Sequence, residues 1–228
     1  MPVALVTGAS QGLGRAIAAA LSARGWVLAL DARGGAALSA AAQLPRCRAV
    51  VGDVADPAHR AELARTVAEL GGLDLLVNNA SHLGASPLPP LADYPLAELA
   101  RVYEVDVFAP LALTQLVLEQ LRGRAGTVVN VSSDAAVEAY AGWGGYGSAK
   151  AALDALTAVL GVEEPALRVY AFDPGDMRTA MHQLAFPGED ISDRPDPATV
   201  VPALLRLLEE RPPSGRYRAA DLATAMPA

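Results

Sequence analysis

The stretch TGASQGLG at residues 7–14 decides the fold, because it joins a short apolar run at 3–7 to an alanine-rich helical pattern at 12–24. Glycines in such a turn let the backbone approach a pyrophosphate closely, and the free N–H groups at the start of the helix attract its negative charge. We therefore predict a dinucleotide-binding loop, although an ordinary strand–helix turn can also carry this GxxxGxG spacing. The residues expected to touch the dinucleotide are Gly8, Ser10, Gln11, Gly12, Leu13 and Gly14.

Beyond this loop, short apolar runs alternate with helical stretches rich in alanine and leucine. This alternation is typical of a parallel sheet with helices on both faces. We therefore predict a single α/β domain over residues 1–228, with a Rossmann-type doubly wound parallel sheet flanked by helices. The predicted strands are 3–7, 26–31, 48–51, 73–77, 126–132 and 167–172, and the predicted helices are 12–24, 35–43, 57–70, 95–121, 145–160 and 197–209, with a kink at Pro110 in the fourth.

Two segments rich in proline, glycine and polar residues, 81–95 and 174–197, interrupt this alternation, and each follows a predicted strand. Ligands of open α/β sheets bind beyond the carboxyl ends of the strands, so we expect these segments to hold a substrate. Residues 180–195 of the second segment are predicted to form a mobile lid. The histidine in this lid, His182, is more simply explained as solvated than as a substrate contact.

The composition narrows the classes of partner. A formal net charge of -7 argues against nucleic acid and against an anionic membrane surface, because both attract basic proteins. No uncharged apolar run is long enough to cross a bilayer, and the three histidines lack ligand-like spacing, so we expect no membrane span and no metal site. The one cysteine, Cys47, cannot form an internal disulfide, and the first residues lack the features of a signal peptide. We expect a cytoplasmic protein that binds a small molecule.

The only lysine of the chain points to acid/base chemistry. Lys150 lies four residues after Tyr146, so the two share one face of the helix predicted at 145–160. A phenol with an ordinary pKa of about 10 is a poor acid or base at neutral pH, and a neighbouring ammonium lowers that pKa by favouring the phenolate. We therefore predict that Tyr146 is an acid/base group activated by Lys150. A surface tyrosine and a solvated lysine could share this spacing by chance.

Further motifs follow the other predicted strands, in the order Asp53-Val54, Asn78-Asn79-Ala80, Val131-Ser132-Ser133 and Asp173-Pro174-Gly175-Asp176-Met177-Arg178-Thr179. Together with the glycine loop and the Tyr–Lys pair, they resemble the short-chain dehydrogenase/reductase family from Val3 to about Thr179. The resemblance implies an oxidoreductase that moves hydride between a nicotinamide cofactor, NAD(H) or NADP(H), and a carbonyl or alcohol. It also implies a homodimer or a homotetramer.

The resemblance implies roles for individual residues. Ser133 lies thirteen residues before Tyr146, a spacing similar to the family's motif, and would hold the substrate oxygen while Tyr146 donates a proton to it. Alternation along the strand sends Ser132 to the opposite face, so we prefer Ser133. Lys150 would also hydrogen-bond the nicotinamide ribose. The other residues expected beside the cofactor are Asp53 and Val54 at the adenine, Asn79 and Ala80 along its length, and Pro174, Gly175, Met177 and Thr179 near the nicotinamide.

Two positions depart from the family's pattern. Ser81 stands where relatives usually have glycine, and we expect this change to affect the shape of the loop more than the chemistry. Asp106, which we include among the candidate catalytic residues, stands where relatives commonly have an asparagine that holds a water of the proton relay. An ionised Asp106 could still accept from that water, and its charge would raise the pKa of Tyr146 against the effect of Lys150. Alternatively, Asp106 lies outside the relay.

The end of the second predicted strand, WVLALDAR at residues 26–33, bears on the choice of cofactor. An acid there binds the ribose hydroxyls of NAD, whereas an arginine accommodates the extra phosphate of NADP. Counted from Gly25 without a gap, the discriminating positions of the family are Ala32 and Arg33, which favours NADP(H). Shortening the turn by one residue would instead put Asp31 on the ribose and give an NAD(H) enzyme. Arg33 could also be a solvated residue paired with Asp31.

Three functions are compatible with these motifs. The preferred one is NADPH-dependent reduction of a small neutral ketone or aldehyde, because the substrate segments carry apolar residues and few fixed charges. A non-catalytic dinucleotide-binding sensor or scaffold is the main alternative, although such proteins usually lose the acid/base pair that Tyr146 and Lys150 would form. A sugar-nucleotide epimerase or dehydratase would use similar residues, but those proteins usually carry a larger C-terminal substrate domain.

Overall fold

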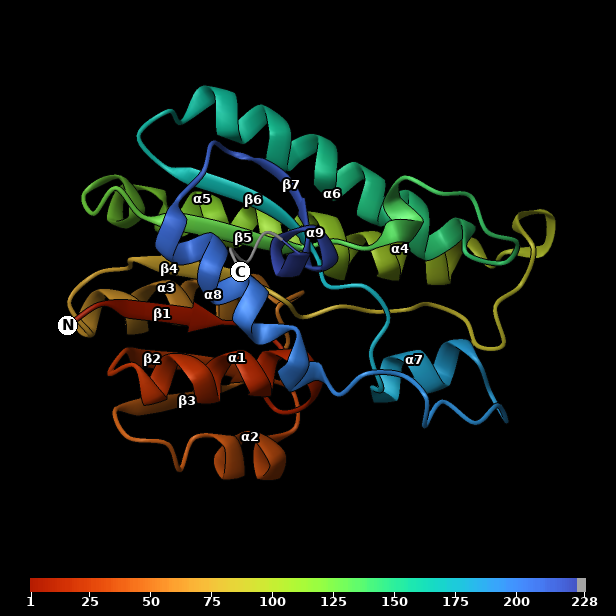
Figure 1. The fold of residues 1–228 in the computed structure, drawn as a ribbon, viewed down its shortest axis with the longest axis horizontal. Helices are drawn as coiled ribbons and strands as arrows, with labels where there is room; N and C mark the ends of the chain where they lie inside the picture. Colours follow the sequence, from red (N-terminus) through yellow and green to blue (C-terminus); the bar gives the residue numbers. More distant parts are fainter. Residues whose placement is uncertain (225–228) are drawn as a thin grey trace.

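One parallel sheet of seven strands organises the part of the chain that this computed structural model describes, residues 1–224. The last four residues of the predicted domain, 225–228, lie outside the described residues. The strands are β1 (Val3–Val6), β2 (Val27–Ala32), β3 (Cys47–Val51), β4 (Leu75–Asn78), β5 (Thr127–Val131), β6 (Arg168–Asp173) and β7 (Gly215–Arg218). Their order across the sheet is β3-β2-β1-β4-β5-β6-β7 (Figure 1).

The order of the strands reverses beside β1. This strand pairs with β2 on one side and with β4 on the other, so the chain builds the sheet outward in both directions from its middle. In open α/β sheets such a reversal leaves a crevice at the carboxyl ends of the strands, where ligands bind. The prediction of a Rossmann-type doubly wound parallel sheet is confirmed.

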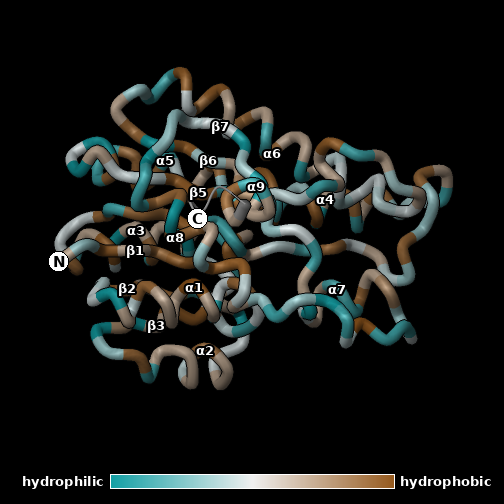
Figure 2. The backbone as a smooth tube through the Cα atoms, viewed as in Figure 1, coloured by the Kyte–Doolittle hydropathy of each residue, from teal (hydrophilic) through white to brown (hydrophobic). Residues whose placement is uncertain are grey.

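Buried apolar residues hold helices against both faces of the sheet. One cluster joins α1 (Gly12–Ala23) and α8 (Val201–Glu210) to one face, and a second joins α3 (Pro57–Glu69) and α5 (Ala109–Arg122) to the other. Side chains alternate along a strand, and those of β1 accordingly divide between the two clusters. Hydrophobic residues follow the central strands in Figure 2. Both faces are therefore closed to ligands, which leaves the ends of the strands.

The remaining helices are α2 (Gly35–Ala41), α4 (Leu96–Tyr103), α6 (Gly144–Glu163), α7 (Ala180–Ala185) and α9 (Ala219–Thr224). Short 3₁₀ helices occur at Leu91–Asp93, Asp134–Ala136 and Pro197–Thr199. Within residues 1–224, no helix has both the length and the apolar character that a membrane span requires.

The helix predicted at 95–121 is divided in the structure. After α4, a π-helical turn runs over Glu104–Phe108, and α5 begins at Ala109. Pro110, where a kink was expected, lies in the first turn of α5, a position that tolerates proline. Because proline has no N–H to donate to the preceding turn, the hydrogen-bond ladder is interrupted there and the wider π turn forms just before it. This turn buries Asp106.

Three short elements have no counterpart among the predicted ones. The strand β7 has only four residues, with the polar sequence GRYR, and it extends the sheet beside β6. The helix α7 forms inside segment 174–197, where the Thr179 hydroxyl accepts a hydrogen bond from the N–H of His182 and caps the helix. The helix α9 follows β7 directly. Elements this short show no clear hydrophobic period in the sequence.

Candidate active site

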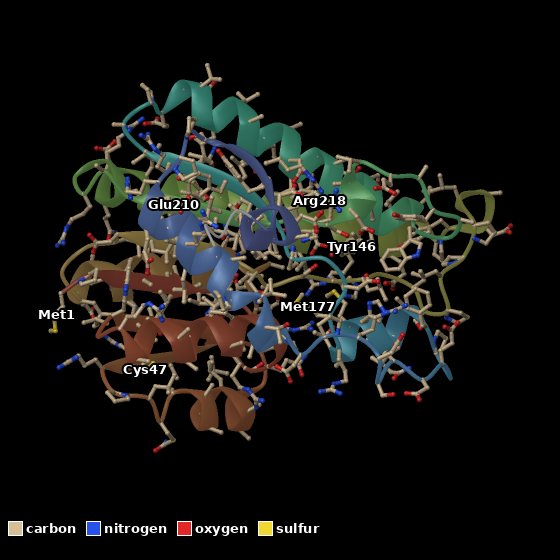
Figure 3. All side chains as sticks on the ribbon, in the orientation of Figure 1. Met1, Cys47, Tyr146, Met177, Glu210 and Arg218 are labelled. Carbon is tan, nitrogen blue, oxygen red and sulfur yellow. The ribbon has the colours of Figure 1, made fainter. Side chains whose placement is uncertain are left out.

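A cavity of about 890 Å³ lies at the carboxyl ends of the strands. The glycine loop after β1, the ends of β2 to β6 and the helix α7 all contribute to its walls. Figure 3 labels two lining residues, Tyr146 from α6 and Met177 from the segment after β6. Every residue predicted for the site lines this cavity except Gly14 and Asp106. Among the described residues, no group of three or more His, Cys, Asp or Glu side chains could hold a metal ion.

The glycine loop leaves room for a bound dinucleotide. Gly8 and Gly12 have φ angles of 64° and 52°, in the left-handed region that favours glycine. A Cβ on Gly8 would lie 2.9 Å from the Cα of Ala80, and one on Gly14 would lie 2.5 Å from the carbonyl oxygen of Gly8. Gly14 therefore serves the close packing of α1 on the loop. The N-cap residue, Gln11, makes no side-chain cap bond, so the first N–H groups of α1 suit a pyrophosphate.

Asn79 fastens the end of β4 to the glycine loop. Its side-chain Nδ2 donates to the carbonyl oxygens of Thr7 and Gly8 over 2.9 and 3.2 Å. The Thr7 hydroxyl oxygen in turn accepts from the backbone N–H groups of Asn79 and Ala80, each over 3.0 Å. These bonds fix the loop before any ligand binds, so the loop loses little conformational freedom on binding.

Asp31 is buried and already has partners. Its Oδ1 lies 2.6 Å from Nε2 of His59 on α3, and the N–H of Gly8 also donates to its carboxylate. Burial raises the pKa of Asp31, and His59 and the Gly8 N–H oppose that rise. The expected alternative, a pair between Asp31 and Arg33, is wrong, because His59 occupies the carboxylate. Sequence reasoning missed His59, which lies 28 residues away on another element.

Arg33 and Asp53 bring charges to the end of the cavity that lies beside β2 and β3. Arg33 is exposed at the edge of the cavity, and its charge lowers the pKa of Asp53. Burial acts the other way on Asp53, but the N–H of Ala55 and the guanidinium of Arg101 outweigh it. Among residues 1–224, Asp53 forms its ion pair with Arg101 rather than with Arg33, so the guanidinium of Arg33 can meet an additional anionic group.

Tyr146 and Lys150 lie together inside the protein. The Nζ atom of Lys150 is 5.4 Å from the centre of the Tyr146 ring and donates to the carbonyl oxygen of Val131 over 3.0 Å. Burial raises the pKa of Tyr146, Lys150 lowers it, and Asp106 raises it again. Lys150 by itself does lower the pKa of Tyr146, as expected. The net pKa of Tyr146 is nevertheless raised, because burial and the nearby carboxylates outweigh the ammonium.

The two neighbouring serines bind different partners. The hydroxyl of Ser133 donates to Oδ1 of Asp134 over 2.9 Å and accepts from the N–H of Ala135. The hydroxyl of Ser132 is buried and donates to the carbonyl oxygen of Ser133 over 3.5 Å. Burial raises the pKa of Asp154 on α6, and Ser132 and Arg216 oppose that rise. Both serines line the cavity, so alternation along the strand does not remove Ser132 from the cavity wall. It does give the two hydroxyls different hydrogen-bond partners.

Arg216, from the unpredicted strand β7, ties together the segments that carry these serines and the loop after β6. Its Nη2 donates to the carbonyl oxygen of Ser133 over 3.0 Å and to Oδ2 of Asp173 over 2.8 Å. Its Nε donates to Oδ2 of Asp154 over 3.0 Å. The other oxygen of Asp173 accepts from the N–H of Gly175 and shapes the loop after β6. No sequence signal indicates Arg216, because its role depends on β7 joining the sheet.

Apolar and aromatic side chains form the outer part of the cavity. The ring of Trp143 lies 5.7 Å from that of Tyr146 and 6.0 Å from that of Phe186, measured between centroids. Leu83 and Met181 belong to the same apolar cluster. His182 was expected to be solvated, but its side chain is only 9% exposed, because α7 packs it against Phe186. Segments 81–95 and 174–197 both contribute to this part of the cavity, as expected.

Comparisons with known proteins agree with this arrangement. The family model described as short chain dehydrogenase matches residues 2–190. The chain belongs to the short-chain dehydrogenase/reductase family. It is 39% identical to sepiapterin reductase of Meriones unguiculatus over 80% of this chain and 77% of that protein. It is 35% identical to human L-xylulose reductase over 78% of this chain and 73% of that protein.

A solved structure shares both the fold and the family. The short chain dehydrogenase of Escherichia coli CFT073, solved in complex with NADPH, superposes with a TM-score of 0.86 and 30% identity over 96% of each chain. The chain is therefore an oxidoreductase that acts on the CH–OH/C=O couple, as its family does.

Asp106 and Ser81, the two residues that depart from the expected pattern of motifs, are joined in the structure. Asp106 is completely buried in the π-helical turn, and its Oδ2 accepts from the Ser81 hydroxyl over 3.0 Å. Its Oδ1 accepts from the N–H of His82 over 2.8 Å, and Nζ of Lys150 lies 3.9 Å from Oδ2. Burial raises the pKa of Asp106, and Lys150 opposes it. Ser81 was expected to affect the shape of the loop more than the chemistry, and its hydrogen bond to Asp106 is a contact that the sequence did not predict.

Proposed function

We propose that this protein is an NADPH-dependent reductase of small, neutral ketones or aldehydes. The observation that carries the proposal is the convergence of Ser133, Tyr146 and Lys150 on one cavity that also includes a glycine loop suited to a pyrophosphate. Non-catalytic relatives usually lose the acid/base pair, so a sensor or scaffold role is disfavoured. Bound NADPH would supply the hydride.

The residues around the reacting carbonyl would then have different roles. Tyr146 would donate its phenolic proton to the substrate oxygen, and the positive charge of Lys150 would stabilise the phenolate that remains. The Ser133 hydroxyl would hold the same oxygen, which requires it to turn from Asp134 toward the substrate. Burial of Tyr146 and Lys150 excludes water from these steps and strengthens their mutual interaction.

The adenosine end of the cavity favours NADP(H) over NAD(H). Asp31 is occupied by His59 and the Gly8 N–H, so it offers no free carboxylate to the ribose hydroxyls. Arg33 is exposed at the cavity edge, where a phosphate on the ribose would meet it. The related Escherichia coli structure was solved with NADPH. These observations support the ungapped register, with Ala32 and Arg33 at the discriminating positions.

The outer part of the cavity favours a substrate with an apolar surface. Trp143, Phe186, Leu83 and Met181 supply most of this part, and an apolar lining penalises charged ligands. The relatives named sepiapterin reductase and L-xylulose reductase are reductases by name, which supports reduction as the physiological direction. We also propose a cytoplasmic location and assembly as a homodimer or homotetramer.

A panel assay tests the proposed function. The absorbance of NADPH should fall when the protein meets suitable members of a panel of ketones, aldehydes and vicinal diketones, and NADH should be used less well. Tryptophan fluorescence titrated with NADPH gives cofactor binding in the same samples. A protein that binds NADPH but consumes it with no member of the panel would contradict the proposal.

A further inference from the structure

His59 reaches from α3 to a carboxylate in the wall of the cavity. Its Nε2 lies 2.6 Å from Oδ1 of Asp31, and the two side chains are only 5% and 1% exposed. The imidazole passes so close to the backbone of Gly52 that a Cβ there would lie 2.2 Å from its Nδ1. Glycine at this position therefore leaves the space that His59 needs to reach Asp31, which itself lines the cavity.

The pair of His59 and Asp31 carries no net charge while the imidazole is protonated. A buried carboxylate is costly unless a positive charge accompanies it, and His59 is the cation within reach of Asp31. The hydrogen bond to Asp31 raises the pKa of His59, whereas burial lowers it, and the net change is a rise. Glu62 and Asp56 also face the imidazole, and their negative charges favour its protonated form as well.

With both carboxylates paired, this end of the cavity has one cation in excess. Asp53 forms an ion pair with Arg101, as Asp31 does with His59. Arg33 lines the same wall and belongs to no ion pair among residues 1–224. An excess positive charge suits an anionic group such as the phosphate that distinguishes NADP from NAD. An unpaired charge on Asp31, two residues from Arg33, would oppose that phosphate.

We propose that His59 is a specificity-determining residue for the cofactor, because it neutralises Asp31 and so lets the 2′-phosphate of NADP(H) bind beside Arg33. The proposal rests on the NADPH dependence proposed above. Without the charge of His59, Asp31 would repel the phosphate, and its freed oxygens could accept from the ribose hydroxyls of NAD(H) instead. A residue of α3 that does not itself line the cavity thereby sets which of the two cofactors the cavity accepts.

Binding of the two cofactors tests this role without any substrate. Titration of tryptophan fluorescence with NADPH and with NADH at neutral pH gives a Kd for each, and the Kd for NADH divided by that for NADPH measures the preference. His59→Gln keeps a hydrogen-bond donor but brings no positive charge, so it should lower this ratio about tenfold, the size expected for one nearby unpaired charge. If His59→Gln does not fold, His59→Ala takes its place with the same expected direction.

Removing the Asp31 carboxylate separates its charge from any other effect of His59. Asp31→Asn should leave the ratio close to that of the parent, because the native pair is already neutral. Adding His59→Gln to Asp31→Asn should cause no further loss, since no carboxylate is left to neutralise. Asp56→Asn is the control, because it removes a carboxylate beside His59 that does not line the cavity and keeps the side-chain cap of α3. Its ratio should equal that of the parent.

The outcomes separate the role of His59 from the proposed function. A loss of about tenfold in His59→Gln that disappears in the Asp31→Asn background supports the proposal. An unchanged ratio in His59→Gln, or the same loss with and without the Asp31 carboxylate, overturns it and leaves the proposed reductase standing if the parent still prefers NADPH. A parent that binds NADH more tightly than NADPH contradicts both the role of His59 and the proposed choice of cofactor.

Discussion

At the residue scale, Ser132 and Ser133 differ in what their hydroxyls bind. Ser133→Ala should lower kcat/KM for carbonyl reduction by about 10²-fold, because it removes a donor to the substrate oxygen. Ser132→Ala should keep most of the activity and lower the free energy of unfolding by about 1 kcal/mol, because it removes the hydrogen bond of one buried hydroxyl. Steady-state kinetics and urea unfolding of both variants check this. The reverse order of activities would show that Ser132 holds the substrate.

Cofactor choice is a second question at the residue scale. Arg33→Ala should reduce the preference for NADPH over NADH, measured as the ratio of the two kcat/KM values, by at least about tenfold, because one charge-assisted phosphate contact is lost. Arg65→Ala is a matched control, since Arg65 is an exposed arginine paired with Glu69 on α3. A parent that prefers NADH, or an Arg33 variant with an unchanged ratio, would contradict the ungapped register.

At the scale of elements, β7 matters because Arg216 connects it to the site. Arg216→Ala should lower the free energy of unfolding by about 2 kcal/mol, since it removes charge-assisted bonds to Asp154 and Asp173. Turnover should fall more than affinity for NADPH, because the Ser133 carbonyl loses its anchor. Arg218→Ala, at an exposed position of the same strand, is the control. Equal losses of stability and turnover in Arg216→Ala and Arg218→Ala would show that Arg216 only stabilises β7 and does not position Ser133.

The longer apolar elements of the fold can be predicted from the sequence, and the shortest elements cannot. Strands β1 to β6 are recovered because each contains an apolar run between turn residues, and all except the edge strand β3 are almost entirely buried. The strand β7 and the helix α7 are missed, because a strand of four polar residues and a helix of one to two turns depend on tertiary contacts. The π-helical turn before Pro110 is also missed, since proline signals a break but not its geometry.

At the scale of the whole molecule, the doubly wound topology explains why distant motifs meet. The motifs after β1, β3, β4, β5 and β6 all line one cavity, because parallel strands end at the same edge of the sheet. Their convergence could be predicted from the sequence. The partnerships of Asp31 with His59 and of Ser81 with Asp106 could not, because each joins side chains more than twenty residues apart whose packing no local pattern encodes.

The cavity as a whole is proposed to reduce carbonyl groups with Tyr146 as the proton donor. The most direct test compares kcat for NADPH-dependent reduction, and Kd for NADPH, between the parent and Tyr146→Phe. In Tyr146→Phe, kcat should fall at least about 10²-fold while Kd stays close to that of the parent, because only the phenolic hydroxyl is lost. A variant that retains kcat within about tenfold of the parent would show that Tyr146 is not the proton donor.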